Sequence, residues 1–244
     1  MDARSKQKPA NAVGEAADAD PSALADGGAS NPLRRTRAQA QTVKRKQILA
    51  AAQAVFERSG YDGASMNDIA AEGGISKPTL YVYFDSKEKL FDGLIEDMNA
   101  SLPERVLNLD AENPDLLGVL VRGGVALLTK ITRPERIKML RVVVGAAGKF
   151  PEIGQKYFRA GPGKGIEIFG AYLRAVAARG WLDVPDPELA AYHLLELMQS
   201  VHMRRMIFAI AEQPSETEIE RTVEAGVRVF LAAYRTSTPI TSRG

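Results

Sequence analysis

The feature that most constrains the fold is a glycine pair, Gly73-Gly74, set between two short apolar-patterned segments within residues 65–84. Glycine adopts positive φ without strain, so the pair predicts the end of one helix and a sharp turn. Ser65 and Ser76 each precede one segment, and serine hydroxyls cap helices by accepting backbone N–H groups. The stretch therefore predicts two short helices joined by a turn, which is a helix-turn-helix.

Three neighbouring residues define the limits of these helices. Asp68 follows Ser65 by three positions and supplies the reciprocal carboxylate of a capping box. Pro78 fits only a first turn, where a missing N–H breaks no hydrogen bond. The second helix is therefore expected to begin near Lys77.

Apolar periodicity predicts one helix before this motif and one after it. Between about Thr42 and Ser59 the apolar residues form one helical stripe, and Gly60 is expected to end that helix. Asp85 with Glu88 resembles a second capping pattern, which opens a fourth helix that continues through Met98. The first three helices form one unit, and the fourth is the natural connection to the rest of the chain.

The segment from Val43 to Leu94 resembles the DNA-binding domain of the TetR family of transcriptional regulators. Most of this resemblance comes from Ser76 to Phe84 and from Ser86 to Leu90. It implies that the second helix of the motif enters the DNA major groove. By resemblance, phosphates are held by Thr79, Tyr81, Tyr83 and Lys87, and the residues nearest the bases are Lys77, Pro78 and Val82.

The DNA-binding candidates also include Ser65 and Arg45. Val82 departs from the polar or aromatic residue often found there, and its side chain offers only apolar contact, for example with a thymine methyl. Tyr81 and Tyr83 have packing as an alternative role, but hydroxyl groups beside lysines favour phosphate contact.

Composition limits the class of protein. The 244 residues contain no Cys, which excludes disulfides, thiolate zinc sites and cysteine nucleophiles. No apolar run reaches the roughly 18–20 residues that span a bilayer, so we expect a cytoplasmic protein without a membrane partner. A net charge of +2 is too small for wholesale coating of nucleic acid, so DNA affinity must come from local clusters.

Residues 1–40 are expected to be a disordered extension with a basic end, because large apolar residues are almost absent there. The basic residues at and just beyond this end are interpreted as an arm that reaches phosphates or a minor groove, with a solvated charge run as the alternative. They are Arg34, Arg35, Arg37, Lys44, Arg45 and Lys46. The other expected divisions are a DNA-binding domain at 41–88, an effector-binding and dimerisation domain at 89–236, and a disordered tail at 237–244.

The second domain is predicted to be helical throughout, so the fold class is all-α. Pro114 and Pro134 each open a helix, and Phe150-Pro151 favours a break. The spacing of Phe150-Pro151-Glu152, Phe158, Gly161-Pro162, Tyr172-Leu173 and Gly180 is similar to the C-terminal domain of the efflux-pump repressor, AcrR-like, branch of the TetR family.

The last two helices predict a homodimer. The helix from Leu189 to Val201 is apolar nearly all round and needs covering on two sides, and the final helix carries a sustained apolar stripe. Pairing both with their symmetry mates gives a four-helix interface. Its expected residues are Leu194, Leu197, Met198, Val201, Val223, Gly226, Val227 and Phe230.

A ligand pocket is expected in the second domain, as the family resemblance implies. Arg141 borders an apolar line and suits an acidic or carbonyl group, and aromatic residues suit pocket walls. The candidates are Arg141, Tyr157, Phe158, Tyr172 and Trp181, each with a core role as its alternative. His193 and Glu196 share a helix face but provide too few ligands for a metal, so neither metal nor cofactor is expected.

Two other classes stay open. An enzyme is disfavoured because Gly-x-Ser-x-Gly, His-Glu-x-x-His and P-loop patterns are absent from the sequence. An architectural DNA binder would need no effector cavity. We expect a transcriptional repressor that binds double-stranded operator DNA as a homodimer and responds to an unidentified small molecule.

Overall fold

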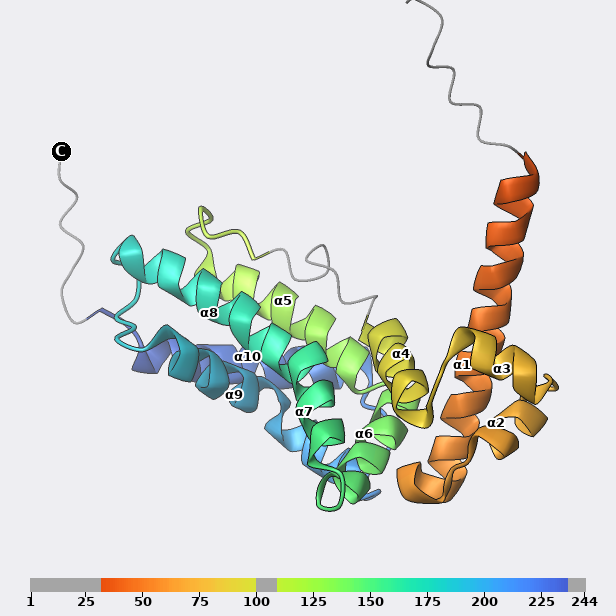
Figure 1. The fold of residues 1–244 in the computed structure, drawn as a ribbon. Coiled ribbons are helices and arrows are strands. Elements are labelled where there is room, and N and C mark those ends of the chain that lie inside the picture. The colour runs from red at the N-terminus through yellow and green to blue at the C-terminus, as the bar shows by residue number, and fades with distance from the viewer. Residues whose placement is uncertain (1–31, 100–108, 237–244) are drawn as a thin grey trace, which may run out of the picture. The chain divides into compact units, whose positions relative to one another are not determined.

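The computed structural model describes residues 32–99 and 109–236 of the 244-residue chain. Within these ranges every regular secondary-structure element is a helix. The described residues also contain an isolated β-bridge between Leu182 and Arg235. The expected all-α class is therefore confirmed (Figure 1). No helix in these ranges combines the length and the hydropathy needed to cross a bilayer. The expected tail at 237–244 and residues 1–31 of the expected extension lie outside the described residues.

The first helix, α1 (Pro32–Gly63), begins well before the expected start at Thr42, so the expected extension is helical over residues 32–40. The chain divides into two compact units between Gln41 and Thr42, and all packing described below lies within residues 42–236. Gly60 has φ 70°, which interrupts α1 where the sequence predicted its end.

The helix-turn-helix has the predicted boundaries. Helix α2 (Met66–Glu72) is capped by Ser65, and α3 (Lys77–Tyr83) is capped by Ser76. The next helix, α4 (Lys87–Asn99), differs in its cap, because the Ser86 hydroxyl accepts the Lys89 N–H at 3.2 Å. The predicted cap at Asp85 is therefore wrong by one residue.

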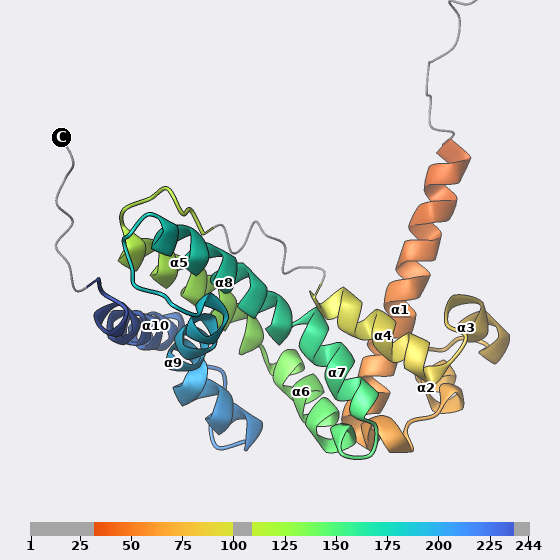
Figure 2. The ribbon, with the colours of Figure 1, turned by 60° about the vertical axis from the view of Figure 1, so that its left-hand side comes forward.

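The remaining helices begin mostly at prolines, whose fixed φ suits a first turn. They are α5 (Leu116–Ile131), α6 (Pro134–Ala147), α7 (Pro151–Ala160), α8 (Pro162–Ala178), α9 (Pro187–Ile207) and α10 (Glu216–Ala233). Pro114 lies just before α5, which is capped by Asp115. A capping box of Ser215 and Glu218 opens α10 and was not predicted. Figure 2 shows α5, α8, α9 and α10 gathered into one bundle, as their mutual contacts require.

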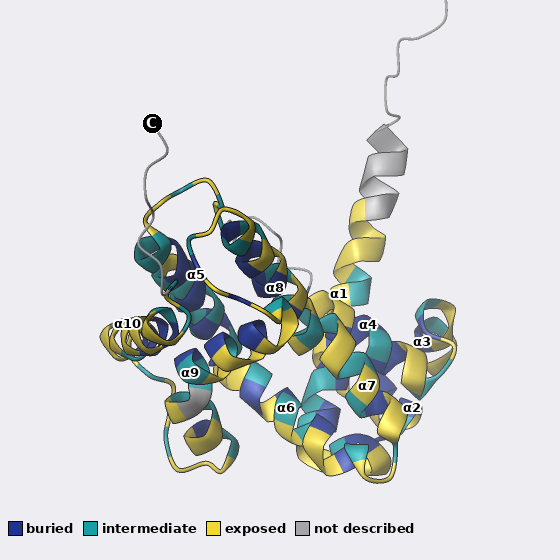
Figure 3. Cartoon of the chain, turned by 90° about the vertical axis from the view of Figure 1, so that its left-hand side faces the viewer, coloured by how far each residue is buried: buried dark blue, intermediate teal, exposed yellow. Residues whose placement is uncertain are grey.

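The buried side chains form two clusters. Figure 3 marks the buried residues along the helices in dark blue. The first joins α1–α4 and also takes in Met139 and Val143 of α6 and Ile153 of α7. The second lies among α5, α8, α9 and α10. Helix α4 contributes Phe91 and Leu94 to the first cluster, so it packs as part of the core around the helix-turn-helix. The domain boundary predicted between residues 88 and 89 lies inside α4, whose buried side chains all pack with the first cluster.

Helices α9 and α10 approach most closely at Gly226. A Cβ atom at this position would lie 2.7 Å from the Leu197 carbonyl oxygen and 3.1 Å from the Met198 nitrogen, both backbone atoms. Because helix backbone cannot rotate aside as a side chain does, a larger residue would push the two helices apart. The sequence led us to expect that Gly226 admits a helix of a partner, whereas it admits α9 of the same chain.

Gly226→Ala is expected to lower the free energy of unfolding by about 1–3 kcal/mol, despite the higher helix propensity of alanine. Chemical denaturation followed by circular dichroism measures this. Gly145→Ala in α6 is the matched control, because nothing lies within 4 Å of its added Cβ. The control should gain roughly 0.5–1 kcal/mol. Equal gains in both variants would show that the approach at Gly226 has room to spare.

Candidate functional site

The turn of the helix-turn-helix is held by local hydrogen bonds and by one long-range bond. The Ser76 hydroxyl accepts the Thr79 N–H at 3.2 Å, and Gly74 has φ 58°, which few residues other than glycine adopt. The Gln47 side chain of α1 donates to the Gly73 carbonyl at 2.6 Å. Together these contacts fix the angle at which α3 leaves the turn.

Helix α3 has one buried residue and a continuous exposed face. Leu80 is fully buried. Lys77, Pro78, Tyr81 and Val82 are all exposed, and Val82 at 82% is the most exposed large apolar side chain in the described residues. This face therefore presents a cation, a phenol hydroxyl and apolar surface to solvent side by side.

The other two candidates on α3 are half-buried. The Thr79 hydroxyl shares a hydrogen bond of 2.7 Å with the Ser76 hydroxyl, and Tyr83 packs against the first buried cluster. Both therefore contribute to holding α3 in place.

Lys87 has a different environment from the one that the family resemblance implied. Its ammonium donates to three carbonyls at the end of α1: Tyr61 at 2.8 Å, Asp62 at 3.3 Å and Ala64 at 3.0 Å. It also lies 4.7 Å from the centroid of the Tyr61 ring. An ammonium has three hydrogens, and all three are used here. We therefore interpret Lys87 as a clamp between α4 and the turn after α1, rather than as a phosphate contact.

Lys87→Ala is expected to lower the free energy of unfolding by about 1.5–3 kcal/mol, because hydrogen bonds from a charged group are lost. The salt dependence of DNA binding should stay unchanged. Lys77→Ala is the matched control, since Lys77 is exposed on α3. Its stability should change by less than about 0.5 kcal/mol, and its affinity for the operator should fall because a cation in the major groove is lost. The opposite pattern would place Lys87 against DNA.

The basic residues before the motif are only partly free. Arg45 lies 3.5 Å from the Asp97 carboxylate of α4, and its guanidinium lies 5.6 Å from the centroid of the Phe84 ring. Lys44 donates to Gln47 at 3.0 Å, and Lys46 is exposed. The side chains of Arg34, Arg35 and Arg37 lie outside the described residues.

Ser65 acts within the motif. Its hydroxyl accepts the Asp68 N–H at 3.2 Å and donates to the Asp68 carboxylate at 2.6 Å. These bonds use the hydroxyl hydrogen in the cap of α2.

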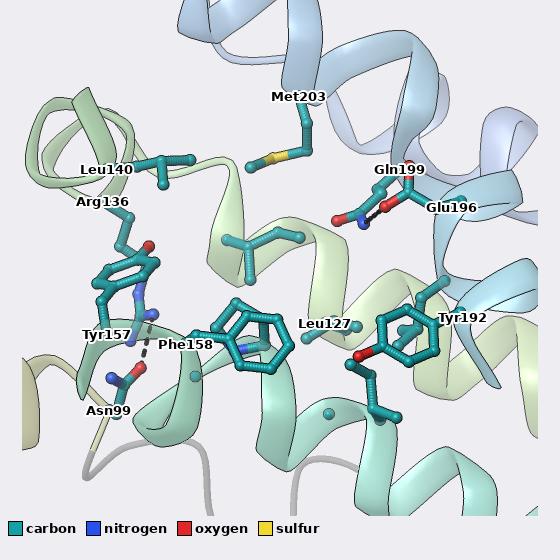
Figure 4. A pocket seen from close by; sticks show the side chains of 16 residues that line it. Asn99, Leu127, Arg136, Leu140, Tyr157, Phe158, Tyr192, Glu196, Gln199 and Met203 are labelled. Atoms are coloured by element: carbon teal, nitrogen blue, oxygen red, sulfur yellow. Dashed lines mark hydrogen bonds between the residues drawn. The ribbon is translucent and has the colours of Figure 1, made fainter. Parts of the chain in front are cut away.

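A cavity of about 190 Å³ lies between helices α5 to α9 and reaches Asn99 at the end of α4. Apolar side chains such as Leu127, Ile166 and Met203 form much of its wall. Its polar side chains lie in two groups (Figure 4). One group is Asn99, Arg136 and Tyr157, and the other is Tyr192, Glu196 and Gln199.

The structure separates the five pocket candidates. Tyr157 and Phe158 line the cavity. Arg141 instead donates to the Ile207 carbonyl at 2.9 Å and to the Met206 carbonyl, so it ties α6 to the end of α9. Tyr172 is 4% exposed in the second buried cluster, where burial raises its pKa to about 12. Trp181 packs against that cluster, with the Arg179 guanidinium 5.8 Å from its ring.

The arginine in the cavity wall is Arg136, which the sequence did not single out. Its guanidinium donates to the Asn99 side-chain oxygen at 3.2 Å and to the Met98 carbonyl. Burial lowers the pKa of Arg136 and raises the pKa of the neighbouring Tyr157. Helical periodicity could have pointed to Arg136, because Leu140, one turn later on α6, faces the same cavity. Arg141 lies next to Leu140 in sequence but on another face.

Six of the eight predicted interface residues are buried within the chain itself: Leu194, Met198, Val223, Gly226, Val227 and Phe230. They pack α9 and α10 against α5 and α8. Val201 is 50% exposed, and Leu197 is half-buried beside an exposed groove that Val229 and Ala233 also line. Helical periodicity predicted the apolar faces of α9 and α10, but it did not predict which face is exposed on the surface of the chain.

Both histidines pair with neutral side chains. His193 lies 2.8 Å from the Tyr234 hydroxyl, and His202 lies 2.9 Å from the Thr222 hydroxyl. Among residues 32–99 and 109–236 no group of three or more His, Asp or Glu side chains is placed to hold a metal ion.

Two family models match the chain. The one described as "Bacterial regulatory proteins, tetR family" covers residues 48–94, and "AefR-like transcriptional repressor, C-terminal domain" covers residues 118–236. The HTH-type transcriptional repressor BepR of Brucella suis is 29% identical over 115 residues, which are 46% of this chain and 54% of BepR. The match thus spans about half of that relative.

Solved structures resemble the fold over about four-fifths of this chain. A protein described as a TetR-family transcriptional regulator from Mesorhizobium loti is 30% identical with a TM-score of 0.70, and the match covers 80% of this chain and 98% of that one. The flavonoid-responsive regulator FrrA is 28% identical with a TM-score of 0.69, over 81% and 100% of the two chains.

Proposed function

Because this chain belongs to the TetR family of bacterial transcriptional regulators, we propose that it is a repressor that binds a pseudo-palindromic operator as a homodimer and leaves it when a small molecule binds. The observation that carries the proposal is the exposed face of α3, where Lys77, Pro78, Tyr81 and Val82 project from a helix held by Ser76. It acts on DNA in the cytoplasm.

On DNA, the two kinds of residue on α3 have separate roles. Lys77, Pro78 and Val82 meet base edges, while Tyr81 and the partly buried Thr79 and Tyr83 hold phosphates. Arg45 keeps only part of its charge available because of Asp97, so it contributes less than an unpaired arginine. Phosphate contacts set the register of the protein, and base contacts set the sequence.

The homodimer uses the outward faces of α9 and α10. Val201 and Val229 are both at least half exposed, and Ala225 is exposed between charged residues of α10. Pairing these faces about a two-fold axis buries them and places two α3 helices in successive major grooves, about 34 Å apart.

Ligand binding in the cavity causes release of the repressor from the operator. It reaches Asn99 in the last turn of α4, and α4 belongs to the core around the helix-turn-helix. A ligand that is bound more tightly by the DNA-incompetent arrangement shifts the equilibrium toward it. Ligand and operator then weaken each other equally. The flavonoid response in the name of FrrA supports an aromatic effector.

The alternatives are less well supported. An architectural DNA binder would need no cavity in the second domain, whereas one of about 190 Å³ is found there. BepR, FrrA and the Mesorhizobium protein are all named as regulators of transcription, which favours a regulator over an enzyme.

Selection of bound sequences from random double-stranded DNA with the purified protein tests this function. The expected result is an inverted repeat whose half-sites are about one helical turn apart. Sedimentation should give the mass of a dimer. Failure to enrich any sequence would contradict the DNA-binding proposal and favour the enzyme alternative.

A further inference from the structure

Arg136 connects the cavity to the helix that leads to the DNA-binding core. Its side chain lies in the cavity wall, and its two hydrogen bonds go to the Met98 carbonyl and to the Asn99 side chain. Met98 and Asn99 are the last two residues of α4. The same guanidinium thus faces the ligand space and holds the end of α4.

The positive charge of Arg136 has no acidic partner among the described residues. None of their carboxylates lies within 4.0 Å of it, and the nearest bonded groups are a carbonyl and an amide. Lys130, at the end of α5, is only 8% exposed, and its ammonium has no hydrogen-bond partner among these residues. Burial, with Arg136 and Arg133 nearby, lowers the pKa of Lys130 to about 8. The neighbouring Glu135 acts on Arg136 electrostatically but forms no ion pair with it, so neither buried cation has a direct carboxylate partner among the described residues.

The rest of the cavity limits the size and polarity of what enters. A dry cavity of about 150 Å³ in another protein accepts benzene, so 190 Å³ suits one aromatic ring with a small substituent. Leu127 and Phe158 lie between the two polar groups (Figure 4). On the far side, the Glu196 carboxylate accepts from Gln199 at 2.9 Å and retains capacity for a donor on the ligand.

We propose that Arg136 binds the anionic end of the effector, a single-ring aromatic carboxylate or phenolate, and in doing so releases the end of α4. The proposal rests on the ligand-released repressor described above. The ligand oxygen competes with the Met98 carbonyl and the Asn99 amide for the same guanidinium hydrogens. A charged acceptor forms the stronger hydrogen bond, so the exchange favours the ligand.

Exchange of partners predicts that two substitutions both weaken operator binding but have opposite effects on ligand binding. Asn99→Ala removes an acceptor that holds Arg136 in the DNA-competent arrangement. It should weaken operator binding and strengthen ligand binding, since the arginine no longer has to leave Asn99. Arg136→Gln removes the charge from both arrangements, so operator binding and ligand binding should both weaken.

Operator binding is measured by fluorescence anisotropy on the selected DNA, without ligand. Arg136→Gln and Asn99→Ala should each weaken it about tenfold, the value of one charge-assisted hydrogen bond. Arg141→Gln is the matched control, because Arg141 also donates from α6 to backbone carbonyls but does not line the cavity. Its operator affinity should match the wild type. If Arg141→Gln lost as much operator affinity as Arg136→Gln, the loss would be explained by general destabilisation, and the proposal that Arg136 acts through α4 would be overturned.

Ligand binding is measured by calorimetry with benzoate, 4-hydroxybenzoate and the neutral isostere benzamide. Wild type should bind at least one of the anions about tenfold more tightly than benzamide, and Arg136→Gln should abolish this preference. Arg136→Lys keeps the charge and should keep the preference, which covers the case that Arg136→Gln fails to fold. Equal binding of benzamide, tighter benzoate binding by Arg136→Gln, or no anion binding below about 10 mM would each overturn the proposal.

The two proposals fail in different ways. Wild-type protein that enriches no DNA sequence refutes the repressor. If the wild type binds its selected operator and Arg136→Gln binds operator and benzoate with the same affinities, only the proposed role of Arg136 is refuted.

Discussion

Phe91→Ala should lower the free energy of unfolding by about 3–5 kcal/mol. Phe91 of α4 is 0% exposed. Its ring makes edge-to-face contacts with Phe56 at 5.4 Å and with Tyr61 at 5.2 Å between centroids. Truncation therefore leaves a cavity between α1 and α4 and also removes two aromatic contacts, each worth about 0.5–1.5 kcal/mol.

Urea denaturation followed by circular dichroism measures this loss. Val144→Ala provides the control, because Val144 is 59% exposed and loses methyl groups without creating a cavity; its change should stay within about 0.5 kcal/mol. Phe91→Leu should fall between the two variants. A loss below about 1 kcal/mol for Phe91→Ala would mean that the helices close over the space that the ring leaves.

The same aromatic cluster explains how the second domain is held to the first. The Tyr61 ring also meets Phe150, at the junction of α6 and α7, at 5.3 Å between centroids. Lys149 beside it is 2.7 Å from the Asp62 carboxylate, and Lys156 of α7 is 2.8 Å from Asp92 of α4. Helices α6 and α7 therefore contact both α4 and the end of α1, so a displacement at the cavity has a direct route to the helix-turn-helix.

Val82→Asp should weaken operator binding by about 2–5 kcal/mol, roughly 30-fold or more, with almost no loss of stability. Val82 is 82% exposed on α3 and belongs to neither buried cluster. In the proposed complex a carboxylate at this position is buried without a partner against a duplex that carries one negative charge per about 1.7 Å. Desolvation and repulsion therefore act together.

Val82→Asn is the matched control, since asparagine has the shape of aspartate without its charge. We expect this variant to bind with a smaller loss and to prefer a different base at one position in each half-site. Anisotropy and repeated selection from random DNA measure both effects. Similar affinities for the Asp and Asn variants would place Val82 outside the groove, and a fall in melting temperature would indicate a packing role instead.

Much of the helix-turn-helix was predictable because its interactions are short in sequence. The bonds from Ser65 to Asp68 and from Ser76 to Thr79 span three residues, and Gly74 needs positive φ whatever surrounds it. Interactions of this kind depend only on residues close together in the sequence. The prediction at Asp85 missed by one residue because two neighbouring residues, Asp85 and Ser86, can both cap a helix.

The side-chain roles that depend on distant partners were not predictable in the same way. Lys87 looks like a free cation in the sequence, yet its three acceptors lie 23 to 26 positions away. Arg136 and Arg141 are equivalent arginines on one helix, and only the packing of α4 and α9 assigns one to the cavity and the other to a helix end.

From the amino-acid sequence alone, caps, turns and periodicity predicted the helical class and the position of the helix-turn-helix, because they act over a few residues, and the resemblance of Ser76 to Leu90 gave the family. Tertiary structure alone decided which apolar face of α9 and α10 is covered by the chain itself, which arginine borders the cavity and where the ammonium of Lys87 is bound. Each of these depends on which of several chemically equivalent surfaces meet when the helices pack, and periodicity is the same for all of them.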